Sequence, residues 1–310
     1  MALCIFHRST LTSVYQSTEN PGRIWWCPTG PLTFLPIHAA GIYTPGEEVT
    51  LSDYAISSYT PTVSSLTDLV RKSRAQESSG AQTKLALVAV TDPCEGQVSL
   101  PGAAVEIRKV AEEATKAGIS TSVLVDAEAT KEATIAGMKT HSCVHLACHA
   151  MQDERDSLSS NFILTDDRLS LSSIMSLDLG SGSSRGSGGV AELAFLSACQ
   201  TGAGSNELSE EAVHLAAGMM GAGYTGVVAT MWPIPDLHAP TVAQEFYRDL
   251  FRRSGLLSNE GEDGRPGSRV DVKQAAYSLN HAMRTLRKQL DLKDAELSFL
   301  AWVPYVHFGL

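Results

Sequence analysis

Two residues that could work together in nucleophilic chemistry, His149 and Cys199, each follow an apolar run of the sequence. The runs at 143–148 and 191–198 are typical of strands that are buried on both faces of a sheet. A cysteine thiolate is a nucleophile, and a neighbouring imidazole can lower the thiol pKa and protonate a leaving amine. Because the carboxyl ends of parallel strands meet at one edge of a sheet, this placement predicts a Cys/His dyad.

The alternative for Cys199 is simple packing, since cysteine is among the residue types most often buried. The turn residues Thr201 and Gly202 follow it directly, which favours a position at the end of a strand. Its partner His149 lies about 50 residues upstream, which is the spacing known from caspases, where the cysteine also follows an alanine such as Ala198. Spacing and placement together favour the catalytic interpretation.

The elements that must position this pair alternate between strand and helix from residue 84 onward. Strands are predicted at 84–90, 122–125, 143–148, 191–198, 225–231 and 301–308. Helices are predicted at 103–117 (closed by Gly118), 128–139, 209–222, 238–252 and 271–290. Such alternation predicts an α/β fold with three layers and a mostly parallel six-stranded sheet.

The remaining segments are irregular or β-rich. Short β elements are predicted at 24–27, 33–35 and 51–59. The polar stretch 71–83 is predicted as a loop or a frayed helix, and 161–179 as a hairpin with a short helix. The Gly/Ser-rich stretch 180–189 predicts a flexible loop.

The composition excludes several classes of function. The chain has 310 residues, 24 Lys and Arg against 34 Asp and Glu, and a formal net charge of −10. This balance disfavours nucleic-acid binding, and no apolar run is long enough to span a membrane. The N-terminal residues show no secretory signal, and six cysteines are too few for a disulfide scaffold. The sequence therefore predicts a cytoplasmic protein.

Three further motifs do not predict a site. The G-x-S-x-G match at 182–186 lies in the Gly/Ser-rich stretch, without the strand that a nucleophile elbow needs. The G-x-G-x-x-G match at 221–226 follows a helix and precedes a strand, which is the reverse of a dinucleotide fingerprint. The His and Cys residues between 141 and 149 lack the ligand spacing of a zinc site, so no metal is predicted.

Four segments of the sequence resemble the CHAT domain family. They are His145–His149, Leu196–Gly202, Ala222–Asp236 and Ala301–Gly309. The segment Ile24–Tyr59 is also similar to the N-terminal part of such domains, so the resemblance covers nearly the whole chain. CHAT domains are caspase-like cysteine peptidases of the same clan as separase, often fused to tetratricopeptide repeats.

The resemblance implies a caspase-like α/β/α sandwich that cleaves protein substrates and needs no cofactor. Residues 1–80 would form the N-terminal β-rich part of the domain, and 81–310 its catalytic core. Cys199 would be the nucleophile and His149 its general acid/base. The backbone N–H groups of Cys199 and Ala150 would form the oxyanion hole. The family usually has glycine at position 150, and an alanine there would be strained if the amide required a glycine-like φ.

The resemblance also implies two substrate-binding residues and a type of partner. Asp236 corresponds to an acidic residue of the specificity pocket and implies a basic side chain at the cleavage position. Its alternative is a carboxylate that caps the helix beginning near 237–239. Trp232 is expected to pack in the core or to form a wall of the cleft. A tetratricopeptide-repeat or other regulatory partner is implied as well.

Two alternatives to a peptidase stay open from the sequence. One is a signalling or scaffold module that keeps the fold and has lost catalysis, which Ala150 would favour. The other is an acyltransferase that uses the same Cys/His pair.

Overall fold

The structure is a computed structural model of the chain. It describes residues 21–44, 49–76, 82–91, 98–151, 153, 156–180, 191–197, 199–200, 211–257, 269–290 and 295–310.

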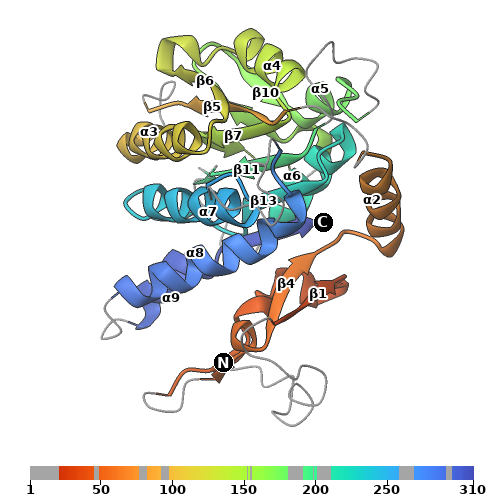
Figure 1. Cartoon of the computed structure of the whole chain (residues 1–310), viewed down its shortest axis with the longest axis vertical. Coiled ribbons are helices and arrows are strands. Elements are labelled where there is room, and N and C mark those ends of the chain that lie inside the picture. Colours follow the sequence, from red (N-terminus) through yellow and green to blue (C-terminus); the bar gives the residue numbers. More distant parts are fainter. Residues whose placement is uncertain are drawn as a thin grey trace.

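A large twisted sheet forms the centre of the molecule (Figure 1). Its strands are β1 (Gly22–Trp26), β4 (Ala55–Tyr59), β5 (Lys84–Ala89), β6 (Ser120–Val125), β7 (Cys143–Ala147), β11 (Leu193–Leu196), β13 (Gly226–Thr230) and β14 (Tyr305–Gly309). The order across the sheet is β1-β4-β14-β13-β11-β7-β5-β6. All neighbours pair in parallel except β13 and β14, which are antiparallel.

The predicted α/β class with a mostly parallel sheet is confirmed, but the predicted number of strands is wrong. The six predicted strands are present, and β1 and β4 extend the sheet to eight strands within the described residues. They join because β4 pairs with β14 through Tyr59 and Phe308, and β1 then pairs with β4. The N-terminal β-rich segment thus shares one sheet with the rest of the chain.

Helices cover both faces of the sheet. They are α2 (Val63–Gln76), α3 (Pro101–Lys116), α4 (Lys131–Thr140), α5 (Leu171–Met175), α6 (Glu211–Ala222), α7 (Ala239–Arg253), α8 (Ala275–Gln289) and α9 (Ala295–Trp302). In Figure 1, α3, α7 and α8 lie on one side of the sheet, and α4, α5 and α6 lie on the other. The three layers are therefore as predicted.

An apolar core lies between the sheet and each of the two helix layers. One joins the sheet to α3, α7 and α8 and includes Ile107, Phe195, Phe246 and Leu279. The other joins the opposite face to α4, α5 and α6 and includes Met138, Leu146, Ile174 and Met219. Alternate residues of each central strand enter opposite cores, which explains why these strands are apolar along their whole length.

A small second sheet lies at the carboxyl edge of the main sheet. Its strands are β8 (His149–Met151), β9 (Asn161–Ile163), β10 (Arg168–Ser170) and β12 (Cys199–Gln200), in the order β10-β9-β8-β12. Strands β8 and β12 pair in parallel, whereas β8–β9 and β9–β10 are antiparallel. A two-stranded ribbon of β2 (Gly41–Ile42) and β3 (Val49–Thr50) lies apart from both sheets.

Three local predictions are corrected. The segment 33–35 is not a strand, because Gly30–Phe34 forms a 3-10 helix that begins with glycine at φ +56° and a proline. The segment 51–59 is a strand only from Ala55 onward, because Leu51–Asp53 forms a 3-10 helix. In the stretch 71–83, residues 71–76 are helical, which agrees with the helix alternative, and 77–81 lie outside the described residues. The final strand is shorter than predicted, since residues 301 and 302 end α9. The Gly/Ser-rich stretch at 181–190 also lies outside the described residues.

Within the described ranges, the helices are too short or too polar to cross a lipid bilayer.

Candidate active site

The central strands β7 and β11 lead to the two residues of the predicted dyad. These strands pair in parallel, and both are buried along their whole length. Beyond them the chain enters β8 and β12, whose register aligns His149 with Cys199. Neighbouring strands lie about 4.8 Å apart, and register partners project toward the same face. The structure therefore brings the backbones of His149 and Cys199 side by side.

His149 is held by one hydrogen bond and keeps one nitrogen open. The residue is 2% exposed, and its Nε2 lies 2.7 Å from the carbonyl oxygen of Val98. A carbonyl only accepts, so Nε2 carries the hydrogen, and Nδ1 of the neutral ring carries the lone pair. Nδ1 is buried and has no hydrogen-bond partner among the described residues. A buried basic nitrogen without a partner is a candidate proton acceptor.

The structure describes the backbone of Cys199 and Gln200, but their side chains lie outside what it describes. The flanking Ala198, Thr201 and Gly202 also lie outside the described residues. Assignment of Cys199 as the nucleophile thus stays a prediction that rests on residue type and register.

Ala150 carries no backbone strain. It lies in the middle of β8, is completely buried and pairs with Phe162 and Gln200 on the two neighbouring strands. The described non-glycine residues with positive φ are Asp126 and Asp178, so Ala150 is not among them. The expected cost of alanine at this position therefore does not arise in this structure. The role of its N–H group in an oxyanion hole stays a prediction.

Asp236 holds the beginning of α3. Its Oδ2 accepts a hydrogen bond of 2.7 Å from the backbone N–H of Gly102. The contact is close, since a Cβ added to Gly102 would lie 2.6 Å from the Asp236 carboxylate. The alternative that Asp236 caps the helix that follows it is wrong, because α7 begins with His238 at the N-cap position. Its role in substrate binding stays a prediction.

Trp232 is half-buried beside the core formed with α3 and α7. Its Nε1 is buried and has no hydrogen-bond partner among the residues described. Trp232 follows β13 and precedes Asp236, so both residues lie at the carboxyl edge of the main sheet.

A buried polar cluster that the sequence did not suggest lies beneath the candidate dyad. Glu106 of α3 contacts His145 of β7 and Ser197, which directly follows β11. One feature of the sequence could have indicated this cluster. Glu106 is an acidic residue on the apolar side of its helix, beside the buried residues Ala103, Ile107 and Val110. The Val98 carbonyl, in contrast, could not be predicted, because every residue type has one.

The histidines near the candidate dyad each contact a different group. His145 Nε2 contacts Glu106, and His141, the C-cap residue of α4, contacts the Gly137 carbonyl through Nδ1. The described part of the chain contains no group of three His, Cys, Asp or Glu side chains that could hold a metal ion.

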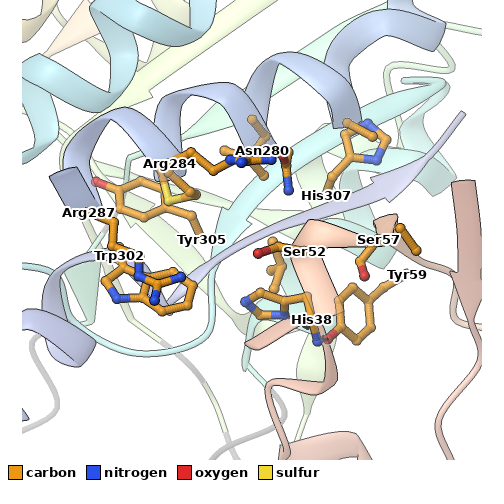
Figure 2. Close-up of a pocket in the computed structure, with 15 residues that line it drawn as sticks. His38, Ser52, Ser57, Tyr59, Asn280, Arg284, Arg287, Trp302, Tyr305 and His307 are labelled. Atoms are coloured by element: carbon orange, nitrogen blue, oxygen red, sulfur yellow. Dashed lines mark hydrogen bonds between the residues drawn. The ribbon is translucent and has the colours of Figure 1, made fainter. Parts of the chain in front are cut away.

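A separate pocket lies between α8, β14 and the N-terminal segment. Figure 2 shows His38 and Tyr59 opposite Asn280 and Arg284 of α8. Burial lowers the pKa of His38 to about 4, although its bond to the Val303 carbonyl partly opposes this shift. His38 is therefore neutral at pH 7. No residue of the predicted active site lines this pocket.

Two solved structures are similar to the chain. One is the Arg-specific cysteine proteinase gingipain R, with 12% sequence identity and a TM-score of 0.49 over 87% of this chain and 60% of that one. The other is the complex of the pro- and mature domains of RgpB from Porphyromonas gingivalis, with 11% identity and a TM-score of 0.49 over 87% of this chain and 61% of that one. The chain thus spans about 60% of the length of each.

No curated protein matches the chain at a significant level. The model of the CHAT domain family matches residues 7–309, which is nearly the whole chain. This match extends from the N-terminal segment through β14 and includes both residues of the candidate dyad. The chain belongs to the CHAT domain family.

Proposed function

We propose that the chain is a cysteine endopeptidase in which Cys199 and His149 form the catalytic dyad. The observation that carries the proposal is the register pair between β8 and β12, which aligns these two residues on neighbouring strands. The open Nδ1 of His149 supports it, because this nitrogen can accept a proton while Nε2 is held by the Val98 carbonyl. Membership of the CHAT family agrees with this chemistry.

The proposed reaction has two stages. His149 Nδ1 takes the thiol proton, and the Cys199 thiolate attacks the carbonyl carbon of the scissile peptide bond. The N–H groups of Cys199 and Ala150 stabilise the resulting oxyanion. The C–N bond then breaks, and the imidazolium gives its proton to the departing amine. Water, deprotonated by His149, attacks the thioester, and the thiol leaves with the proton restored.

The Val98 carbonyl gives this histidine its orientation. It accepts the Nε2 hydrogen, so it selects the tautomer in which Nδ1 is the base. It also lies next to the positive charge that forms on the ring during the reaction, and its dipole stabilises that charge. In this proposal a backbone carbonyl thus performs the orienting task that an aspartate performs in other hydrolases.

The proposed substrates are proteins or peptides with a basic side chain at the cleavage position. Asp236 supplies the negative charge, and Trp232 supplies an apolar wall near it. Both lie at the same edge of the main sheet as the dyad, because each follows the end of a strand there. A tetratricopeptide-repeat or similar regulatory partner and a cytoplasmic location belong to the same proposal.

An irreversible peptide inhibitor tests the proposal. A peptidyl acyloxymethyl ketone with arginine at the position that precedes the scissile bond should form an adduct, and mass spectrometry should map it to Cys199. Cys199→Ala should abolish the adduct, and His149→Ala should slow its formation. If the folded wild-type chain forms no adduct with any such peptide, the chain is a scaffold and the proposal is wrong. If label forms but a separate peptide substrate passes its acyl group to an added amine without net hydrolysis, the chain is an acyltransferase.

A further inference from the structure

A buried carboxylate connects the two strands that lead to the dyad. Glu106 is 1% exposed, and its Oε1 accepts a hydrogen bond of 3.0 Å from His145 Nε2. Its Oε2 accepts a second bond of 3.0 Å from the hydroxyl of Ser197. His145 is completely buried, and Ser197 is 6% exposed. The two oxygens of one side chain therefore hold two different segments of the main chain.

Those two segments are the ones that end at His149 and Cys199. His145 lies in β7, which is followed directly by β8 and His149. Ser197 lies between β11 and β12, two positions before Cys199. The backbone strengthens this connection, because the N–H of Ser197 also donates to the carbonyl of Leu146.

The ring of His145 is fixed on its other sides as well. It stacks on Phe195 of β11 with the ring centres 4.6 Å apart and an angle of 5° between the planes. Its Nδ1 lies 3.3 Å from the hydroxyl of Tyr247 on α7. Glu106 thus binds a histidine that has little freedom to move, so movement of the cluster requires movement of the strands.

The segment that leads into α3 also contacts the candidate dyad. Val98, whose carbonyl orients His149, lies just before α3, and Gly102 in the first turn of α3 is held by Asp236. Helix α3 and the residues just before it therefore contact His149 through Val98, and they contact the segments that lead to His149 and Cys199 through Glu106.

We propose that Glu106 is a positioning residue that sets the relative placement of His149 and Cys199. The inference rests on the proposed peptidase function. Glu106 does not touch substrate; it acts by holding His145 and Ser197 together beneath the site. Removal of its carboxylate leaves two buried donors without an acceptor, so the strand ends shift to satisfy them. A shift on the order of 1 Å at a catalytic pair lowers the rate by roughly 100-fold.

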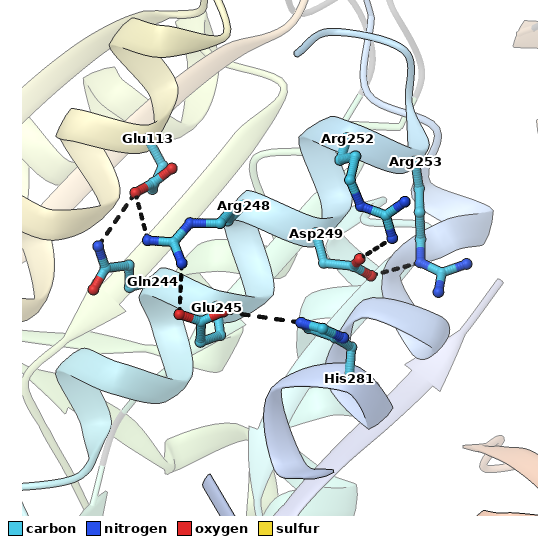
Figure 3. Close-up of polar contacts among 8 residues, drawn as sticks. All are labelled: Glu113, Gln244, Glu245, Arg248, Asp249, Arg252, Arg253 and His281. Carbon is cyan, nitrogen blue, oxygen red and sulfur yellow. Dashed lines mark hydrogen bonds and ion pairs between the residues drawn. The ribbon is translucent and has the colours of Figure 1, made fainter. Parts of the chain in front are cut away.

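The same helix supplies a matched control. Glu113 of α3 is also 1% exposed, and it binds Lys116 of its own helix and two groups of α7, Arg248 and Gln244 (Figure 3). Its contacts lie away from the dyad, between helices rather than beneath the strand ends. Substitution at Glu113 thus reports the general effect of removing a buried carboxylate from α3.

The test compares Glu106→Ala, Glu106→Gln and Ser197→Ala with Glu113→Gln. Labelling of Cys199 by the acyloxymethyl ketone is measured against inhibitor concentration, which separates the maximal rate from the half-saturating concentration. We expect Glu106→Ala and Ser197→Ala to lower the maximal rate at least tenfold with little change in half-saturation. Glu106→Gln still offers an oxygen to His145 and an amide to Ser197, so it should stay within about threefold of wild type. Glu113→Gln should match wild type.

Hydrogen exchange gives a readout that does not depend on activity. Relative to a strand of the same sheet away from Glu106, such as 226–230, peptides that cover 143–151 and 193–200 should exchange faster in Ser197→Ala and Glu106→Ala than in wild type. Glu113→Gln lowers the stability of the whole fold, so it should leave this ratio unchanged. Ser197→Ala keeps the contact between Glu106 and His145, so it tests the inference even if Glu106→Ala does not fold. If wild type is not labelled, the proposed function fails, and exchange alone decides the inference. If wild type is labelled and neither rate nor exchange changes in Ser197→Ala, the inference is wrong.

Discussion

His149 illustrates how one backbone contact decides which atom of a residue is available for chemistry. Because Nε2 is held by the Val98 carbonyl, Nδ1 is the nitrogen available to accept a proton. The register of β8 and β12 aligns this residue with Cys199. The sequence pattern predicted that His149 and Cys199 follow the ends of two parallel strands. It could not predict the Val98 contact, because a carbonyl acceptor leaves no trace in residue identity. The sequence analysis also missed Glu106, because its two hydrogen-bond partners lie far from it in the sequence.

Asp236 gives a prediction at the same scale. Its carboxylate accepts the N–H of Gly102 at the beginning of α3, in the manner of a helix cap. Asp236→Ala should therefore lower the free energy of unfolding by about 1 kcal/mol, as loss of a cap usually does. Asp236→Asn keeps an oxygen acceptor and should lose less, as measured by urea unfolding. An equal loss in both variants would show that the charge, rather than the hydrogen bond, stabilises α3.

Helix α3 shows what patterns of apolar residues predict well at the scale of the element. Its extent was predicted within two residues, and Gly118 follows it with φ +69°, as expected for the end of a helix. The segment 301–308 was predicted less well, since it is mostly apolar and the period of apolar residues alone does not distinguish a strand from a buried helix. Residues 301 and 302 belong to α9, and β14 begins at Tyr305.

Contacts between helices make the stability of the layer around α3 depend on pH. Burial alone would raise the pKa of Glu113, but hydrogen bonds from Arg248, Lys116 and Gln244 outweigh it and lower the pKa from 4.5 to about 2. As the pH falls, the Glu113 carboxylate is therefore protonated in the unfolded chain before it is protonated in the folded chain. The stabilisation is fully present above about pH 4.5 and is lost as the pH falls toward 2.

The corresponding measurement is urea unfolding at pH 7 and pH 3 for wild type and Glu113→Gln. At pH 7 the variant should be less stable by on the order of 1–2 kcal/mol, a value reduced because Arg248 is half-exposed. At pH 3 the difference between the two proteins should shrink. A constant difference across this range would mean that Glu113 is not held in its charged form by these contacts.

The whole molecule is organised by a sheet that crosses the predicted boundary at residue 80. Strands β1 and β4 extend the sheet beyond β14, and side chains reinforce the junction. Arg23 donates to the Gly309 carbonyl at 3.0 Å, and Ser58 Oγ lies 3.0 Å from His307 Nδ1. The sequence indicated β elements in this segment but not their partner, because short strands carry no signal for which edge they join.

Removal of residues 1–80 tests the importance of this junction. The chain 81–310 would leave the edge of β14 unpaired and would expose apolar residues that Tyr59 and Ile37 cover. We expect it to lose roughly 3 kcal/mol or more of stability, or to aggregate. Thermal unfolding of the two chains at equal concentration measures the effect. If 81–310 unfolds at the same temperature as the full chain, the N-terminal segment is an independent addition.

The dyad itself is tested most directly by the pH dependence of Cys199 alkylation. Iodoacetamide reacts with the thiolate, and peptide mass spectrometry follows Cys199 separately from the exposed Cys27, which serves as a reference in the same sample. For wild type, the rate at Cys199 should rise with an inflection clearly below ~8.5, the usual thiol pKa. In His149→Gln the inflection should move up to about 8.5 or higher. An inflection at or above about 8.5 in both proteins would contradict a Cys199–His149 pair.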